Sequence, residues 1–466
     1  QVTMNMVLKN SLLITSFICL AATAYSQKTD SLKSLLNTKH GTERIDVLCE
    51  LGYTHIFNNE IEKAKAYALG AYNLALQKKD TLRIVKAGKV FGSALRRSGA
   101  IDSAIALYEV LLPTIRQKQF KEDLKIVLNS LGMSYLLNAQ YDNALKVNFE
   151  SLDLREQDRD CASVSICLNN IGLVYYKLKD YEKALLYFKR CLALKQKIKN
   201  QYDLERTMVN ISLCYAYVNK FLQAKKAVDS AFFICGDNCD KLIWMEGNFS
   251  MGVIYFLQNS LSSAEKHFRK SYEVANELND KRFLIDNIVY LSEIHITRKQ
   301  PSQAMKYLLE AEMLIREGGH FRLELIKIYT QFIRHYMDDA NFTKVAFYQQ
   351  KYIQLKDSVY DEELTTNLMK IEADFLEKEN NAKIATHKQA ILLNEEVITK
   401  QKLLNAAVTL IAVILIILAV LLFKNVRRKK LINDLLDTKV KERTRELESS
   451  RQELVVACNK RDLLIE

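Results

Sequence analysis

The chain has 466 residues, of which 49% are hydrophobic and 26% charged, and it contains only 13 glycines and 2 prolines. So few turn-forming residues exclude an ordinary all-β protein and favour helices joined by short connections. The formal net charge is +12, but the one dense basic cluster, residues 427–430, adjoins an apolar segment. This position favours a membrane as the partner of the positive charge, and no nucleic-acid partner is expected.

Residues 1–26 have the features of a secretory signal peptide. Lys9 provides a positive charge, residues 11–22 form an apolar run, and residues 24–26 (Ala-Tyr-Ser) place small side chains before a cleavage site at Gln27. An uncleaved anchor helix is the alternative interpretation of this run. Met4 is the expected start of the natural chain.

A small residue recurs every forty residues through the next part of the chain. The series is Gly52, Gly92, Gly132, Gly172, Ser212, Gly252 and Ser292. Twelve residues after each of them comes an alanine, at Ala64, Ala104, Ala144, Ala184, Ala224, Ala264 and Ala304. Within a unit, the apolar residues are three and four apart, which is the spacing of a helix.

Each unit is therefore predicted to consist of two antiparallel helices joined by a short polar link. The small residue and the alanine let the two backbones approach, and aromatic side chains fill the remaining space. One hairpin cannot bury its apolar face alone, so stacked hairpins are expected to form an all-α solenoid. We place this repeat domain at residues 27–360, with about eight units, the last of them degenerate.

The pattern resembles the tetratricopeptide repeat. One unit matches the family's order of apolar, small, aromatic, aromatic, alanine and aromatic residues with Leu168, Gly172, Tyr175, Tyr181, Ala184 and Phe188. The resemblance covers residues 44–357 and implies a superhelix that binds a protein or peptide along its concave face. The usual period of the family is about 34 residues, so the longer period predicts longer helices here.

The same resemblance implies which side chains line the concave groove. Carried over by position, the candidates for peptide binding are Arg96, Arg97, Asn129, Asn169, Tyr176, Lys177 and Arg206. Amides suit a peptide backbone, and cations suit a carboxylate. Solvated surface is the alternative for each of them.

Nine cysteines occur in the chain, and most of them occupy apolar helical positions typical of packed thiols. Cys235 and Cys239 flank a turn in the stretch CGDNC, where either a disulfide or a pair of free thiols fits an oxidising compartment. No further ligands lie near them in the sequence, so no metal site is expected.

Residues 361–402 are predicted to form one long helix, which is a candidate for pairing with a second copy of itself. Five of its apolar residues recur at spacings of three, four and seven: Leu364, Leu368, Ile371, Phe375 and Ala382. Residues 403–423 carry no formal charge and are long enough to cross a membrane as a helix. The basic residues that follow place the C-terminal side in the cytoplasm, and a cleaved signal peptide places the repeats outside it.

Residues 424–466 are predicted to form a cytoplasmic coiled coil that makes the protein a homodimer. Its heptad seam comprises Ile432, Leu436, Val440, Leu447, Leu454, Ala457 and Leu464, with polar interruptions that suit a helix pair able to shift. Residues 441–448 (KERTRELE) resemble the linker helix of sensor histidine kinases, and residues 460–466 (KRDLLIE) are similar to the segment that leads into their phosphoacceptor histidine. Neither that histidine nor a nucleotide loop follows, so we expect the chain to be truncated before a catalytic core.

The sequence thus favours a sensor in the inner membrane, with extracytoplasmic repeats, one membrane helix and a histidine kinase output in two-component signalling. No catalytic residue and no cofactor are expected in the chain itself; ATP and Mg²⁺ would belong to the missing core. Two alternatives remain open at this point. One is a membrane scaffold for protein–protein interaction, and the other is a transmembrane transcriptional regulator with a missing DNA-binding domain.

Overall fold

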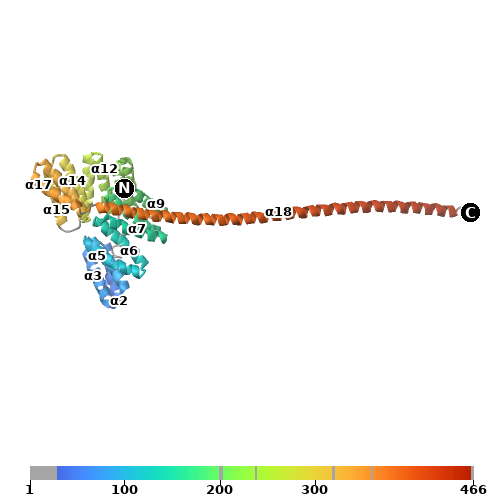
Figure 1. The fold of residues 1–466 in the computed structure, drawn as a ribbon, viewed down its shortest axis with the longest axis horizontal. Helices are drawn as coiled ribbons and strands as arrows, with labels where there is room; N and C mark the ends of the chain where they lie inside the picture. The colour runs from blue at the N-terminus through green and yellow to red at the C-terminus, as the bar shows by residue number, and fades with distance from the viewer. Residues whose placement is uncertain are drawn as a thin grey trace, which may run out of the picture. The chain divides into compact units, whose positions relative to one another are not determined.

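The structure is a computed structural model that describes residues 29–198, 203–236, 239–316, 321–357, 359 and 362–462. The predicted signal peptide therefore lies outside the described residues. The chain divides into two compact units, one that ends at Phe375 and one that comprises Leu376–Glu466. In the first unit, helices α2 to α17 follow one another as stacked antiparallel pairs (Figure 1).

The helices of the first unit share a narrow range of lengths. Their bounds are α2 (Gly41–Phe57), α3 (Ile61–Lys78), α4 (Thr81–Arg97), α5 (Ile101–Gln117), α6 (Lys121–Leu137), α7 (Tyr141–Gln157), α8 (Cys161–Lys177), α9 (Tyr181–Lys197), α10 (Leu204–Tyr217), α11 (Phe221–Cys235), α12 (Lys241–Leu257), α13 (Leu261–Glu277), α14 (Lys281–Thr297), α15 (Pro301–Arg316), α16 (Arg322–Asp338) and α17 (Phe342–Asp357). Helix α18 (Glu362–Asp462) begins in the first unit and continues through the second.

The forty-residue period is the sum of two equal halves. Helices such as α4, α5 and α6 each have 17 residues, and links of three residues separate them. A helix and its link thus take up twenty residues, and a hairpin with both links takes up forty. The structure agrees with the prediction that the longer period reflects longer helices.

The short links share one backbone conformation. Their middle residue has a left-handed φ, as at Asn59 (59°), Lys179 (64°) and Lys299 (55°). The next residue donates its N–H to a carbonyl five positions back, as Asp180 does to Tyr175 over 3.0 Å. This Schellman arrangement satisfies carbonyls at the helix end and turns the chain into the next antiparallel helix.

The small residue on the first helix of a hairpin makes room for a ring on the second. A Cβ added to Gly172 would lie 2.7 Å from the ring of Phe188, which is fully buried. The same relation joins Gly92 to Tyr108 and Gly252 to Phe268. Because each ring fills the space that a side chain on the first helix would take, the glycine sets how closely the helices pack.

The first helices of the hairpins form one layer of the array. Within this layer α2 contacts α4, α4 contacts α6, α6 contacts α8, α8 contacts α10, and α10 contacts α12. Successive second helices are separated by the first helix that lies between them in the chain. The layer whose helices lie closer together must be on the concave side of the solenoid. We call the concave surface of this layer the inner face; it is formed by α2, α4, α6, α8, α10, α12, α14 and α16.

Helix α18 has 101 residues. It contains an 18-residue window with a mean hydropathy of 3.3, none of which is buried. By length and composition alone, this helix meets the requirements for crossing a membrane. The seam residues Leu436 and Leu447 are also exposed on the single chain.

Candidate binding surface on the inner face

Oppositely charged side chains from neighbouring hairpins pair across the inner face. The two residues of each pair are about one repeat apart in the sequence. The first residue of each pair lies six positions before the small residue of its own hairpin. The pairs are Asp46 with Lys86 (2.8 Å), Arg206 with Glu246 (3.0 Å) and Asp286 with Lys327 (2.6 Å). The candidate Arg206 is therefore occupied by a neighbouring carboxylate, and its pairing favours a role in holding α10 to α12.

Asparagines form a second kind of bridge between hairpins. The amide of Asn170 donates a hydrogen bond to Asn129 Oδ1 over 2.8 Å, and the amide of Asn210 donates one to Asn169 Oδ1 over 3.3 Å. The candidates Asn129 and Asn169 are only partly buried. Since each uses its oxygen within the array, its amide nitrogen is the group left to face a ligand.

Three of the predicted inner-face cations have no carboxylate partner among the described residues. Among the described residues, no carboxylate lies within ion-pair distance of Arg96, Arg97 or Lys177. The Nε of Arg96 is buried without a hydrogen-bond partner in the described part of the chain. Burial lowers the pKa of both Arg96 and Lys177, because each charge is partly withdrawn from water. These two groups would gain from an anion placed beside them.

Tyr176, another predicted groove residue, has a packing role. Its ring lies 5.7 Å from that of Tyr181 and 6.0 Å from that of Tyr217. The hydroxyl of Tyr217 in turn lies 2.6 Å from that of Tyr290 on α14. Burial raises the pKa of Tyr176 well above its usual value. The solenoid thus curls enough for α8, α10 and α14 to meet through aromatic side chains.

This curvature surrounds Lys177 with charged residues from much later hairpins. Among the charged residues that act on its ammonium, Asp286 and Lys327 have the largest effects, followed by Glu324 and Arg282. Glu324 is 2% exposed, and its carboxylate lies 3.9 Å from Arg282. Sequence reasoning missed this cluster, because Lys177 and the charged residues around it belong to hairpins far apart in the sequence.

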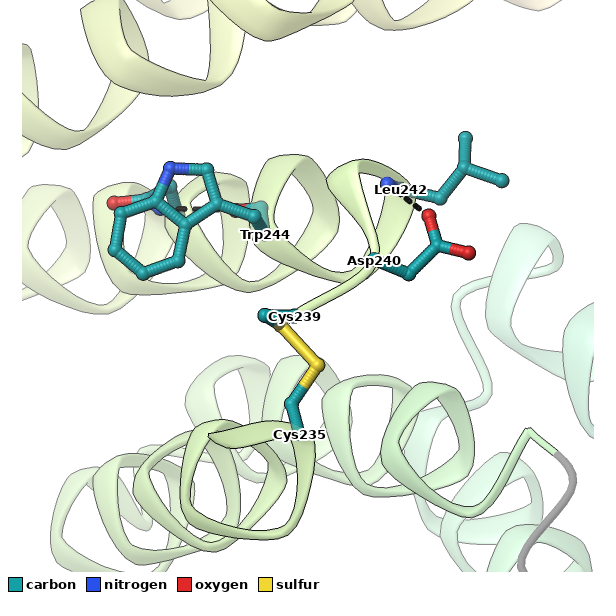
Figure 2. The surroundings of a disulfide bond; sticks show 6 residues. Cys235, Cys239, Asp240, Leu242 and Trp244 are labelled. Carbon is teal, nitrogen blue, oxygen red and sulfur yellow. Dashed lines mark hydrogen bonds between the residues drawn. A yellow bond between two sulfur atoms is a disulfide. The ribbon is translucent and has the colours of Figure 1, made fainter. Parts of the chain in front are cut away.

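A disulfide joins Cys235 and Cys239, the two residues of the CGDNC stretch (Figure 2). It lies where α11 ends and α12 begins, and Asp240 follows it as the N-cap of α12, accepting a hydrogen bond from the N–H of Leu242. The described cysteines Cys49, Cys167, Cys191 and Cys214 are free and buried. In the described part of the chain, no three His, Cys, Asp or Glu side chains are grouped to hold a metal ion.

Comparisons with known proteins concern the repeat array. A family model of the tetratricopeptide repeat matches residues 123–197, which extend from α6 to α9. No curated protein matches the chain. The chain thus contains tetratricopeptide repeats, and the other helices from α2 to α17 follow a similar plan of about twenty residues.

Solved structures similar in fold include the Rap protein in complex with competence and sporulation factor, at 14% identity and a TM-score of 0.47, over 70% of this chain and 99% of that one. NprR in complex with its cognate peptide NprX is 12% identical, with a TM-score of 0.47, over 71% and 98% of the two chains. A STAND-class signal transduction ATPase with a tetratricopeptide repeat sensor, from Pyrococcus horikoshii, is 19% identical, with a TM-score of 0.45. That match covers 55% of this chain and 40% of the ATPase.

Proposed function

We propose that the repeat domain is the sensing part of a membrane receptor and that its inner face binds a peptide or protein segment rich in carboxylates. The observation that carries this proposal is the imbalance among the inner-face cations. Lys86, Arg206 and Lys327 are neutralised by neighbouring hairpins, whereas Arg96, Arg97 and Lys177 are not. An anionic ligand would supply the missing charges.

The asparagine bridges support a peptide as the ligand. Asn129 and Asn169 lie on α6 and α8, between Arg96 on α4 and Lys177 at the end of α8. Amide nitrogens at these positions suit the carbonyl groups of an extended backbone, while the flanking cations suit carboxylates. Along the chain, the order of these groups is therefore cation, amide, amide, cation.

A binding measurement on the full chain in detergent tests this assignment. The probes are short fluorescein-labelled peptides rich in Asp and Glu, and the readout is fluorescence polarisation. Replacing Arg96, Arg97 and Lys177 with alanine is expected to weaken binding about tenfold for each charge-assisted hydrogen bond lost. High salt should weaken binding in the same direction.

The matched control removes the same number of positive charges from second helices. It replaces Lys78, Lys146 and Lys226, which are all exposed, with alanine. The proposal requires that this control bind the acidic peptides as the unaltered chain does. Equal losses in the two variants would mean that only the net charge attracts the peptides, and the inner-face site would be rejected.

The receptor would reach the cytoplasm through helix α18. The uncharged residues 403–423 have the length of one membrane crossing, and residues 427–430 place four basic side chains on the C-terminal side. In this arrangement the repeats and their disulfide lie outside the cytoplasm, where disulfides persist. The seam in residues 432–464 would join two copies as a homodimer on the cytoplasmic side.

The proposed output is a histidine kinase in two-component signalling. Its support is the resemblance of residues 441–448 and 460–466 to kinase linker segments; the side chains of residues 460–466 lie outside the described part of the chain. Membranes from cells that express the gene should incorporate phosphate from ATP on a histidine of the gene product. A gene product without this activity would instead favour a membrane scaffold.

A further inference from the structure

The first turns of α18 are attached to the repeat array. The apolar side chains of Leu364, Leu368, Ile371 and Phe375 pack against the main core of the solenoid. Their spacing of four, three and four residues places them on one side of the helix. Met369, which lies between them, is 66% exposed. The residues expected to pair with a second copy are therefore used within the chain, and we call residues 364–375 the latch segment.

The surface that holds the latch segment is formed by α7 and α9, the second helices of the third and fourth hairpins. Phe375 stacks on Phe149 of α7, with ring centroids 4.1 Å apart. Phe149 is 5% exposed. The equivalent residue is exposed in the other hairpins, where it is Leu69, Glu109, Lys189, Asp229, Arg269 or Leu309. A buried ring at this otherwise exposed position indicates a surface adapted to α18.

Polar contacts fix the register of the latch segment. Lys183 of α9 donates a hydrogen bond to Glu372 over 2.7 Å, and Asn367 donates one to Asp142 of α7 over 3.3 Å. Glu372 and Phe375 lie almost one helical turn apart and engage different helices of the array. The contact therefore defines one position of α18 along α7 and α9, which a purely apolar contact would not.

A row of aromatic rings connects this contact to the inner face. Phe149 lies 6.2 Å from Tyr187, and Tyr187 stacks on Tyr175 at 5.4 Å. Tyr175 is the neighbour of Tyr176, which belongs to the aromatic cluster on the inner face. The last turn of α8 thus presents one tyrosine toward the latch segment and the next toward the inner face, beside Lys177.

We propose that residues 364–375 are a releasable latch, and that the last turn of α8 couples its release to the arrangement of the inner face. Displacement of Tyr176 or Lys177 would shift Tyr175, disturb Tyr187 and Phe149, and free Phe375. The released apolar residues would then be free to pair with the same residues in a second copy of α18. The identity of the trigger rests on the proposed function, but the latch and its coupling are testable without any ligand.

The latch is tested by hydrogen–deuterium exchange of residues 364–375 in the full chain in detergent. Phe149→Ala and Lys183→Glu are each expected to speed exchange there at least about tenfold, whereas Met369→Ala should leave it unchanged. Adding Glu372→Lys to Lys183→Glu reverses the ion pair and should restore most of the protection. Protection that survives both single changes, or a double variant as fast as Lys183→Glu, would overturn the latch.

The coupling is tested by changing the inner face alone. Tyr176→Leu should speed exchange of residues 364–375 severalfold, although the ring of Tyr176 lies against Tyr181 and Tyr217. Tyr255→Leu is the matched control, because Tyr255 is an aromatic residue of α12 that stacks on His267, away from α8 and α18. If the two variants change the exchange of the latch segment equally, the coupling is refuted. Since no peptide is added, failure here is distinct from failure of the inner face to bind acidic peptides.

Discussion

At the scale of single residues, the array depends on complementary sizes across each hairpin. Gly172 and Phe188 occupy one shared space, and neither helix can move aside without disturbing the next hairpin. Exposed glycines in the same array carry no such constraint. Gly70 lies within α3, and a Cβ added there meets nothing within 4 Å.

The two glycines predict opposite effects of one substitution. Gly172→Ala places a methyl group against a buried ring and should destabilise the fold by about 1–3 kcal/mol. Gly70→Ala removes backbone freedom from the unfolded chain and should stabilise it by about 0.5–1 kcal/mol. Urea unfolding followed by circular dichroism measures both. Destabilisation by Gly70→Ala as well would contradict the open space around Gly70.

A histidine makes part of the array sensitive to mild acid. The Nδ1–H of His267 on α13 donates a hydrogen bond to Asn248 Oδ1 over 3.0 Å, and the ring stacks on Tyr255. Burial lowers the pKa of His267, and the charges of Lys270, Lys266 and Lys225 lower it further. The unfolded chain therefore binds a proton at a higher pH than the folded chain does.

The sign of the effect follows from this difference in proton binding. As the pH falls below about 6.5, the usual pKa of histidine, the unfolded state gains a proton first and the free energy of unfolding decreases. His267→Gln retains a hydrogen-bonding side chain and removes the titration. Unfolding measured between neutral and mildly acidic pH should show a smaller loss in the variant. An identical pH dependence in both chains would contradict this role of His267.

At the scale of helices and links, the three-residue connection is the repeated unit of construction. Its left-handed middle residue is a lysine, asparagine, arginine or alanine in different links. These residues adopt that conformation because the Schellman hydrogen bond and the packing of both helices fix the backbone there. The link from α11 to α12 departs from this plan. It has Gly236 with φ 65° and carries the disulfide between Cys235 and Cys239 (Figure 2).

Reduction of this disulfide is expected to weaken the α11–α12 connection. The two cysteines are separated by 4 positions, and a loop this short contributes about 2 kcal/mol in the chain-entropy description. Denaturant unfolding of the full chain with and without reductant measures the difference. The double variant Cys235→Ser with Cys239→Ser should match the reduced chain and ignore the reductant. A response of that variant to reductant would place the effect at another cysteine.

At the scale of the whole molecule, the proposed function requires the repeats and the C-terminal seam to be on opposite sides of a membrane. Protease added to intact spheroplasts should digest residues 29–357 and spare residues 424–466, because the bilayer shields the second segment. Antibodies to tags in the two segments read out the result. Loss of the C-terminal tag with survival of the repeats would reverse the orientation and reject the receptor.

The sequence by itself determined the elements and their order. A period of forty with small residues, alanines and aromatics at fixed positions specifies helical hairpins, since helix formation and hairpin packing depend on residues close in sequence. It also indicated the inner-face positions, of which Arg96, Arg97 and Lys177 stay unmatched while Arg206 is paired and Tyr176 is packed among rings.

Only the tertiary structure decided which distant hairpins meet. Three contacts join segments that are many residues apart. They are the hydrogen bond between Tyr217 and Tyr290, the charges around Lys177, and the packing of residues 364–375 on α7 and α9. Their meeting depends on the small rotation between successive hairpins, which accumulates along the solenoid. Local periodicity shows that Leu364, Leu368, Ile371 and Phe375 need an apolar partner, but the curvature of the array selects Phe149 and its neighbours as that partner.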